Sequence, residues 1–247
     1  MCGIVGILGA SDVAGELLDG LKRLEYRGYD SAGICTVVDG SFQRRRAEGK
    51  LRNLAAEMAA DPLKGTSGIA HTRWATHGAP TVDNAHPHIV GDVAVVHNGI
   101  IENFKPLRDE LQAEGRTFLS QTDTEVVGHL VARELERGLS PVDAVAAVLP
   151  RLHGAFALAL LFRNEPDLLI GARLGAPLTV GYGDGENYLG SDALALAGLT
   201  QRIAYLEEGD WVVVRRGSVQ VHDRDNRPVT RPVVASGVTA VVNEKGN

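Results

Sequence analysis

Met1-Cys2-Gly3-Ile4-Val5-Gly6 is the stretch of sequence that decides what we expect of the rest. A residue as small as Cys2 allows the initiator methionine to be removed in the cell, which would leave a thiol and a free α-amine on one residue. An α-amine has a pKa of about 7.7–8.0, so a useful fraction of it is uncharged near neutral pH. It can take the thiol's proton, directly or through a water, and return it to a leaving amine. Cys2 is therefore a candidate nucleophile that carries its own base.

The same stretch also has a purely structural interpretation. Gly3–Leu8 is an unbroken apolar run with the length of a buried strand, and Cys2 can simply be the small residue that precedes it. The first residues do not choose between the two interpretations, so the choice depends on the motifs that follow.

Composition indicates a cytoplasmic globular protein. The 247 residues fit one large domain or two small ones, and two cysteines make no disulfide framework, which is typical of a reducing compartment. A net charge of -6 and the lack of any basic tract beyond Arg44–Arg46 argue against a nucleic-acid partner. The N-terminus lacks the features of a signal peptide, and no apolar run is long enough to span a bilayer, so we expect no membrane association.

Short strands and helices follow one another along the chain. Asp39-Gly40 predicts a hairpin between strands over 31–38 and 41–47. Helical patterns cover residues 13–24, 51–60, 106–114 and 124–137, and Ser140-Pro141 opens a further helix. The sequence predicts other strands over 67–72, 92–97, 155–162, 168–173, 178–182, 187–190, 203–206, 211–215 and 219–222. Two groups of strands with short turns and accompanying helices predict an α+β fold, a layered sandwich of two mostly antiparallel sheets with helices outside.

A dense polar cluster follows the strand over 67–72. Within His71–Gly78, Arg73 offers a planar guanidinium suited to two-point capture of a carboxylate. If the segment coils, Thr76 and His77 lie on the same side as that arginine. The alternative is an exposed arginine paired with a surface acid, beside a core tryptophan.

A second polar cluster is His97-Asn98-Gly99, at the end of another predicted strand. An asparagine amide and a backbone N–H at a glycine are hydrogen-bond donors of the kind that form an oxyanion hole. Asn-Gly is also the commonest hairpin turn signal, which is the alternative. Residues 100–104 do not resume as an alternating strand, and this weakens the hairpin interpretation.

The third cluster, Thr122-Asp123-Thr124-Glu125, fits a capping box and places Asp123 at a helix N-terminus, where the dipole favours a carboxylate. That carboxylate can hold a substrate ammonium, or it can serve only to start the helix. An arginine for a carboxylate and an aspartate for an ammonium together describe an amino-acid substrate. A cysteine and an oxyanion hole between them indicate attack on a side-chain acyl bond.

His86-Pro87-His88 is a candidate metal-binding pair. No set of cysteines or carboxylates with ligand spacing accompanies it in the sequence, so we expect no metal. Cys35, inside an apolar strand, is expected to be an inert core thiol.

Six motifs follow one another in the first half of the chain, namely Met1–Gly6, Glu25–Gly33, His71–Gly78, Asn84–His88, His97–Asn103 and Thr122–Val126. Together they resemble the class II glutamine amidotransferases, and the similarity continues through Gly209-Asp210. Within that family, the motifs around Tyr26–Asp30 and His71–His77 fit the members that aminate a sugar phosphate better than the phosphoribosyl or asparagine members.

The resemblance implies the four-layer αββα Ntn-hydrolase fold and a glutaminase that needs no cofactor. Its ligand would be L-glutamine, which is cut to glutamate and ammonia. The resemblance makes Cys2 the nucleophile and makes Asn98 and Gly99 the oxyanion hole. Glutamine would be held by Arg73, Thr76, His77 and Asp123, Trp74 would lie in a mobile loop that covers it, and Arg27 would help to order the closed site.

We expect the glutaminase domain to cover residues 2–222 and a linker or tail to cover 223–247. The resembling enzymes continue into a sugar-isomerase module that turns fructose 6-phosphate into glucosamine 6-phosphate, and this sequence lacks that module. We therefore expect an excised domain or a stand-alone glutaminase, with a homodimer as a further arrangement to consider. The alternatives are the glutaminase domain of another amidotransferase and a catalytically silent glutamine-binding domain in which Met1 blocks Cys2.

Overall fold

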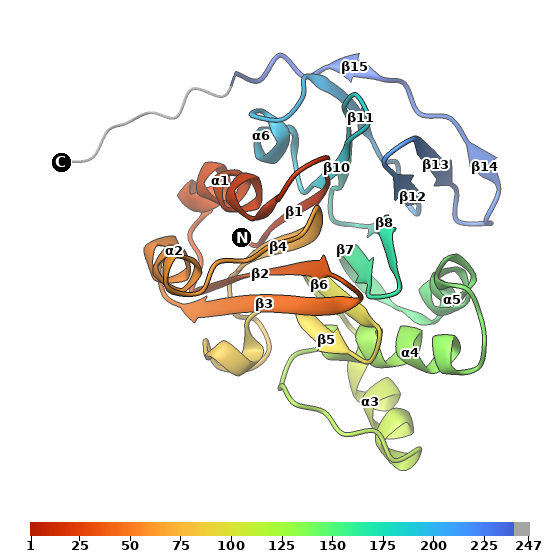
Figure 1. Cartoon of the computed structure of the whole chain (residues 1–247). Coiled ribbons are helices and arrows are strands. Elements are labelled where there is room, and N and C mark those ends of the chain that lie inside the picture. Colours follow the sequence, from red (N-terminus) through yellow and green to blue (C-terminus); the bar gives the residue numbers. More distant parts are fainter. Residues whose placement is uncertain (240–247) are drawn as a thin grey trace.

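The computed structural model describes residues 1–239. Within this range two sheets lie face to face, and helices pack on the outer face of each (Figure 1). The predicted α+β fold, a four-layer sandwich, is confirmed. The last part of the predicted tail, residues 240–247, lies outside the described residues.

The first sheet, sheet A, has β1 near its middle. Its strand order is β15-β11-β9-β10-β1-β4-β2-β3, and each neighbouring pair is antiparallel. The strands are β1 (Gly3–Leu8), β2 (Ser31–Val38), β3 (Ser41–Glu48), β4 (Ser67–Arg73), β9 (Thr179–Tyr182), β10 (Asn187–Gly190), β11 (Arg202–Tyr205) and β15 (Val234–Ala235). Its outer face is covered by α1 (Ala14–Leu24), α2 (Leu51–Ala60) and α6 (Ala193–Leu196), and the short 3-10 helix η1 (Glu25–Arg27) follows α1.

The second sheet, sheet B, has the order β14-β13-β12-β8-β7-β6-β5 and is antiparallel as well. Its strands are β5 (His88–Val90), β6 (Val93–Ile101), β7 (Gly154–Phe162), β8 (Glu165–Leu174), β12 (Trp211–Arg215), β13 (Ser218–His222) and β14 (Pro228–Val229). Helix α4 (Thr124–Glu136) lies on β5 and β6 and carries α3 (Phe104–Ala113) and α5 (Pro141–Val148) beside it. The connections contain the 3-10 helices η2 (Val82–Asn84) and η3 (Leu149–Arg151).

Three apolar clusters fill the spaces between the four layers of helices and sheets. Strand β1 contributes residues to two of these clusters. Ile4 and Leu8 lie in the cluster between the two sheets, whereas Val5 and Ile7 lie in the cluster under α1 and α2. Successive strand residues point to opposite faces, so a strand covered on both faces is apolar throughout. Both interpretations of the opening stretch are thus compatible, because Cys2 directly precedes a strand that is buried along its whole length.

Strand β6 differs from the prediction at its C-terminal end. We expected a strand that stops near His97, but pairing with β7 continues through Asn98 and Gly99 to Ile101. Gly99 has a φ of 106°, which glycine adopts readily, and this keeps the pairing in register without a hairpin turn. The candidate oxyanion donors therefore lie inside a paired strand.

The predicted capping box before α4 is wrong in its details. Asp123 occupies the N-cap position but makes no capping hydrogen bond with its side chain. The Glu125 carboxylate reaches back to the N–H groups of Leu119 and Ser120, at 2.8 and 2.7 Å. The carboxylate of Asp123 is thereby left for contacts outside the helix.

Residues beyond 222 continue along the edges of both sheets. β14 pairs with β13 and β15 pairs with β11, although each is only two residues long. Between them, the Arg231 guanidinium binds both carboxylate oxygens of the buried Asp210, at 2.8 and 2.9 Å. No helix in the part of the chain that the structure describes is long and apolar enough to cross a membrane.

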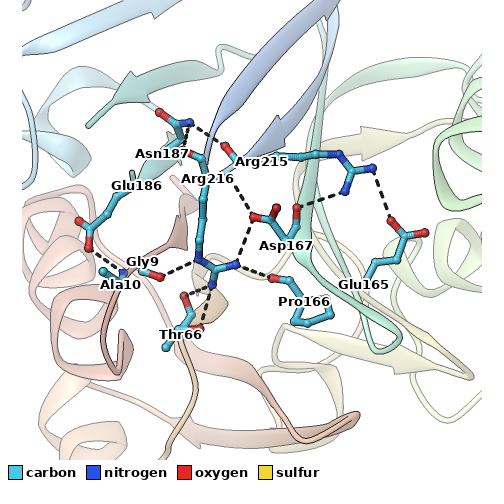
Figure 2. A network of polar contacts seen from close by, with 10 residues as sticks. All are labelled: Gly9, Ala10, Thr66, Glu165, Pro166, Asp167, Glu186, Asn187, Arg215 and Arg216. Carbon is cyan, nitrogen blue, oxygen red and sulfur yellow. Dashed lines mark hydrogen bonds and ion pairs between the residues drawn. The ribbon is translucent and has the colours of Figure 1, made fainter. Parts of the chain in front are cut away.

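One arginine ties the two sheets together at the end of β1 that is farther from Cys2. Arg216, in the turn between β12 and β13, donates to the carbonyl oxygens of Gly9 and Thr66, at 2.8 and 3.0 Å (Figure 2). Its guanidinium also pairs with Asp167, which precedes the buried part of β8, at 3.2 Å. Since Gly9 and Thr66 flank strands of sheet A, this side chain links the two sheets directly.

Candidate active site

The candidate site lies where strands from both sheets converge. Antiparallel pairing sets Gly3 of β1 opposite Thr72 of β4, so Cys2 lies beside the end of β4. Asn98 comes from β6 in the facing sheet, and its Nδ2 donates to the carbonyl oxygen of Cys2 at 3.3 Å. The candidate nucleophile and the candidate oxyanion donor are thus brought together across the gap between the sheets.

The Cys2 thiol is partly buried and sits against the start of the 74–79 loop. Its Sγ accepts a hydrogen bond from the Trp74 backbone N–H at 3.2 Å. Burial raises the pKa of this thiol above its ordinary value, although the Trp74 hydrogen bond acts in the opposite direction. The thiol is therefore protonated at neutral pH, and attack on an amide requires a base nearby.

The N-terminal ammonium shows where a base would be found. In the chain with Met1 present, this group lies 3.2 Å from the carbonyl oxygen of Arg27 and 3.4 Å from that of Gly28. The nitrogen of Cys2 is then part of a peptide bond and cannot accept a proton. Removal of Met1 would convert that nitrogen into an amine on the same residue as the thiol.

Gly99 must be a glycine at this position. Its φ of 106° is unfavourable for other residues, and a Cβ atom would overlap the carbonyl oxygen of Ala155 on β7. The close pairing of β6 with β7 therefore leaves no room for a side chain beside Asn98.

Four histidines are packed against the candidate site. The rings of His71 and His86 are stacked with their centroids 4.1 Å apart, and His86 also lies 4.8 Å from His88 and 6.5 Å from His97. Burial lowers the pKa of all four, to about 3 for His71 and His88. These side chains are therefore neutral and act as directed hydrogen-bonding groups.

The hydrogen bonds of His86 and His97 form a closed circuit with Thr124. His97 donates its backbone N–H to Nδ1 of His86 at 3.2 Å, so the His86 proton is on Nε2, which lies 3.3 Å from Oγ1 of Thr124. The hydroxyl proton of Thr124 is then free to bind Nδ1 of His97, at 2.9 Å. The circuit fixes the N-terminus of α4 to the middle of β6.

Arg73 organises the loop that follows β4. Its guanidinium donates to the carbonyl oxygens of Ala79 and Gly78, both at 3.1 Å, and also to that of His77. The side chain is buried, and its Nε–H and one Nη1–H have no hydrogen-bond partner among residues 1–239. Arg73 thus shapes the loop and keeps two N–H groups for a ligand.

Asp123 lines the same space as Arg73. One of its carboxylate oxygens accepts the backbone N–H of Ile101 at 2.8 Å and lies 3.9 Å from Nδ1 of His97. Because the side chain is 4% exposed and bonds no residue of its own helix, its charge faces the cavity.

Most of the residues that the sequence selected line one small cavity. Its walls are formed by Cys2, Arg73, Trp74, Thr76, His77, His86, His97, Gly99, Thr122, Asp123 and Thr124. Trp74 is 54% exposed at the rim, where its ring lies against Gly28, so the alternative of a core tryptophan is wrong. Asn98 and Arg27 are not among the residues that line the cavity. Arg27 forms an ion pair with Asp192, the N-cap of α6.

The sequence analysis did not select His71, His97, Thr122 or Thr124 as individual site residues. They belong to the quoted motifs, but their contacts cross from one sheet to the other or from sheet B to the segment at the start of α4. A local pattern signals only that polar residues follow strands, whereas the partners of these side chains lie 26–34 positions away in the sequence.

Comparison with known proteins agrees with this geometry. The family described as "Glutamine amidotransferase domain" matches residues 71–198, which is more than half of the chain. The chain belongs to this family. The amidotransferase domain is 68% identical over all 247 residues to the glutamine–fructose-6-phosphate aminotransferase [isomerizing] of Zymomonas mobilis subsp. mobilis, and 62% identical to that of Brucella abortus biovar 1. It spans 41% of the length of each of these relatives.

Solved structures show that the amidotransferase domain has an Ntn-hydrolase fold. The glutamine phosphoribosylpyrophosphate amidotransferase of B. subtilis superimposes with a TM-score of 0.78 at 25% identity, over 90% of this chain and 49% of that one. A glutamine aminotransferase class-II domain protein from Silicibacter pomeroyi gives a TM-score of 0.62 over 90% of this chain and 99% of that one, and at 15% identity it supports the fold alone. The resemblance read from the six motifs is confirmed.

Proposed function

We propose that this domain hydrolyses L-glutamine to glutamate and ammonia, with Cys2 as the nucleophile. The observation that carries the proposal is the meeting of Cys2 and Asn98 across the two sheets, with Asn98 Nδ2 at 3.3 Å from the Cys2 carbonyl oxygen. An amide NH₂ has two donors, so one N–H holds the Cys2 backbone while the other is available to a substrate oxygen.

The reaction proceeds through a thioester. Once Met1 is removed, the α-amine of Cys2 takes the thiol proton, and Sγ attacks the side-chain amide carbon of glutamine. Asn98 and the Gly99 N–H stabilise the oxyanion that develops. The carbon–nitrogen bond then breaks, and the departing nitrogen takes the proton from the α-amine and leaves as ammonia. Water adds to the γ-glutamyl thioester, which releases glutamate and restores the thiol.

The two ends of the substrate would be held by different residues that line the cavity. The free N–H groups of Arg73, with Thr76 and His77, suit the α-carboxylate, and the Asp123 carboxylate suits the α-ammonium. Trp74, exposed at the rim, would cover the bound substrate. Arg27 would act indirectly, because its ion pair with Asp192 holds η1 against the start of α6.

In the whole protein we propose that the ammonia is passed to fructose 6-phosphate to give glucosamine 6-phosphate. The support is the 68% and 62% identity to aminotransferases of that name, of which this chain spans 41%. We place the catalytic domain at residues 2–222 and the linker or tail at 223–247. We also propose that the protein is cytoplasmic, in keeping with the two free cysteines. A homodimer is a further part of this proposal.

The direct test is an assay of glutamate release from glutamine by the isolated chain. We expect release by the chain without Met1, no glucosamine 6-phosphate on addition of fructose 6-phosphate, and no change in the rate of glutamate release. Cys2→Ala is the matched control and should be inactive while its circular dichroism spectrum is unchanged. Turnover of Cys2→Ala within about tenfold of the wild type would overturn the assignment of the nucleophile.

A further inference from the structure

His71 lies where β4 faces β6, directly under the candidate oxyanion donor. Its backbone pairs with Ile4 on β1 and with Gly33 on β2, so the residue is in the centre of sheet A. The side chain is completely buried and crosses to sheet B, where Nε2 lies 2.8 Å from the carbonyl oxygen of His97 and 3.1 Å from Oδ1 of Asn98.

The two contacts of His71 Nε2 determine where its proton resides. The carbonyl oxygen of His97 can only accept, so Nε2 must carry the proton. The neutral ring then has no proton on Nδ1, and this nitrogen has no hydrogen-bond partner among the described residues. His71 therefore presents one N–H, shared between the His97 carbonyl and the Asn98 side chain.

The same geometry determines the orientation of the Asn98 amide. With Oδ1 toward His71, Nδ2 points at the Cys2 carbonyl oxygen, and both contacts are attractive. The flipped amide would set its NH₂ against the N–H of His71 and its oxygen against the Cys2 carbonyl. Both flipped contacts are repulsive, so the histidine and Cys2 together select one of the two orientations.

We infer that His71 is a positioning residue for catalysis, whose Nε2–H holds the Asn98 amide so that its NH₂ faces Cys2 and the developing oxyanion. This inference rests on the proposed glutaminase function. The histidine touches neither substrate nor nucleophile and acts only through Asn98. Stacking of its ring on His86 at 4.1 Å holds the ring plane in place.

The test is a double-mutant cycle on the chain with Met1 removed. His71→Phe keeps a ring that can stack on His86 but removes the N–H, and we expect it to lower kcat by about 10- to 100-fold while KM changes less than about threefold. In the Asn98→Ala background, the same replacement should change kcat by less than about threefold. His129→Phe, at a buried histidine of α4 that contacts neither Asn98 nor Cys2, controls for replacing a buried imidazole by a phenyl ring.

The outcomes separate this inference from the proposed function. If Asn98→Ala keeps the wild-type kcat, the oxyanion assignment is wrong. If Asn98→Ala is impaired but His71→Phe costs the same factor in both backgrounds, then His71 does not act through Asn98 and the inference alone is overturned.

A measurement on the unmodified chain covers the case in which His71→Phe does not fold. The imidazole ¹⁵N spectrum of histidine-labelled protein should show His71 protonated on Nε2 and unprotonated on Nδ1. His71→Gln, which retains a side-chain N–H, assigns the signal and should keep kcat within about threefold of the wild type if its amide donates to Asn98. A proton on Nδ1 would contradict the inference.

Discussion

The Cys2 thiol cannot react until a base takes its proton. Burial raises the pKa of its thiol, and the structure places no imidazole within hydrogen-bonding distance of Sγ among the described residues. His71 Nε2 lies 3.1 Å from Oδ1 of Asn98, His86 Nδ1 accepts the backbone N–H of His97, and His97 Nδ1 binds Thr124. The α-amine that appears when Met1 is removed is therefore the base that fits the thiol.

The charge of Asp123 gives the first prediction. Asp123→Asn keeps an oxygen for the Ile101 N–H, so the fold should persist, but it removes the charge that would pair with the α-ammonium of glutamine. Hydrogen bonds to charged groups contribute about 1.5–3 kcal/mol, so KM should rise by about 10- to 100-fold with a smaller effect on kcat. Steady-state kinetics and inhibition by glutamate measure this.

Asp143→Asn, at an exposed acid in the first turn of α5, is the matched control for loss of one negative charge. Its KM and its inhibition by glutamate should equal those of the wild type. If glutamate inhibits Asp123→Asn as strongly as it inhibits the wild type, Asp123 does not bind the ammonium end of the ligand.

At the scale of single elements, β6 depends on Gly99, which the local sequence pattern marks as part of a hairpin turn. Gly99→Ala would force a Cβ atom against the Ala155 carbonyl at a φ of 106°. We expect the free energy of unfolding to fall by about 2–4 kcal/mol and glutaminase activity to be lost, because β6 must shift away from β7. Urea denaturation measures the first effect. Gly217→Ala, in a turn with open space around it, should change stability by less than about 1 kcal/mol.

The histidine stack that joins β4, β5 and β6 makes stability depend on pH. His71 and His88 have pKa values of about 3 when folded, against 6.5 as the ordinary value, so the unfolded chain binds more protons between these limits. Stability is therefore complete above about pH 6.5 and decreases as the pH falls toward 3. Each histidine contributes about 1.4 kcal/mol per pH unit in this window, so these two should cost about 3 kcal/mol between about pH 7.5 and about pH 5.5.

Urea titrations at the two pH values test this prediction. The carboxylates with lowered pKa, Glu110 and Glu125, titrate at lower pH and contribute little in this window. Because His86 and His97 also have lowered pKa values, His88→Phe should reduce the pH dependence by about a quarter to a third. Equal stability of the wild type at both pH values would mean that these histidines are protonated without unfolding.

The sequence predicted the elements whose signals are local. Asp39 and Gly40 both have positive φ values, 48° and 72°, in the predicted hairpin, and Ser140 caps α5 as expected. The extension of β6 could not be predicted, because Asn98-Gly99 is locally a turn signal and its pairing with β7 comes from a strand more than fifty residues later. Tertiary pairing overrode the local preference.

The candidate site was predictable as a set of residue types but not as an arrangement. An arginine after one strand and an aspartate at a helix start indicated an amino-acid ligand, and both side chains do line one cavity. The sequence could not show that the guanidinium of Arg73 also holds the backbone of its own loop, or that His71 reaches from one sheet to Asn98 on the other. Such contacts depend on how two sheets face each other, which no short motif encodes.

At the scale of the whole molecule, the candidate catalytic groups come from two sheets, so the contacts that hold the sheets together matter. The Arg216 guanidinium binds Gly9, Thr66 and Asp167 at one end of the interface between the sheets (Figure 2). Arg216→Met removes these guanidinium contacts, while the backbone N–H of residue 216 still donates to Asp167 at 2.9 Å. Leaving these carbonyl groups and the carboxylate without their charged donor should lower the free energy of unfolding by about 2–4 kcal/mol.

Arg215, the last residue of β12 and the neighbour of Arg216, provides the matched control. Arg215→Met removes an ion pair with Glu165 at 3.5 Å in which both side chains are more than a third exposed, so stability should change by less than about 1 kcal/mol. Thermal and urea denaturation of both variants give the comparison. Equal losses would show that Arg216 is an ordinary surface arginine.

The central claim is that Cys2 reacts only when its own α-amine is free. The most direct measurement uses one preparation of the chain with an N-terminal tag that a protease removes directly before Cys2, and compares glutamate release from glutamine before and after cleavage. We predict no release above that of Cys2→Ala before cleavage and full glutaminase activity afterwards, with the same circular dichroism spectrum in both states. Equal rates of glutamate release before and after cleavage would contradict the account, because Cys2 would then react without the amine.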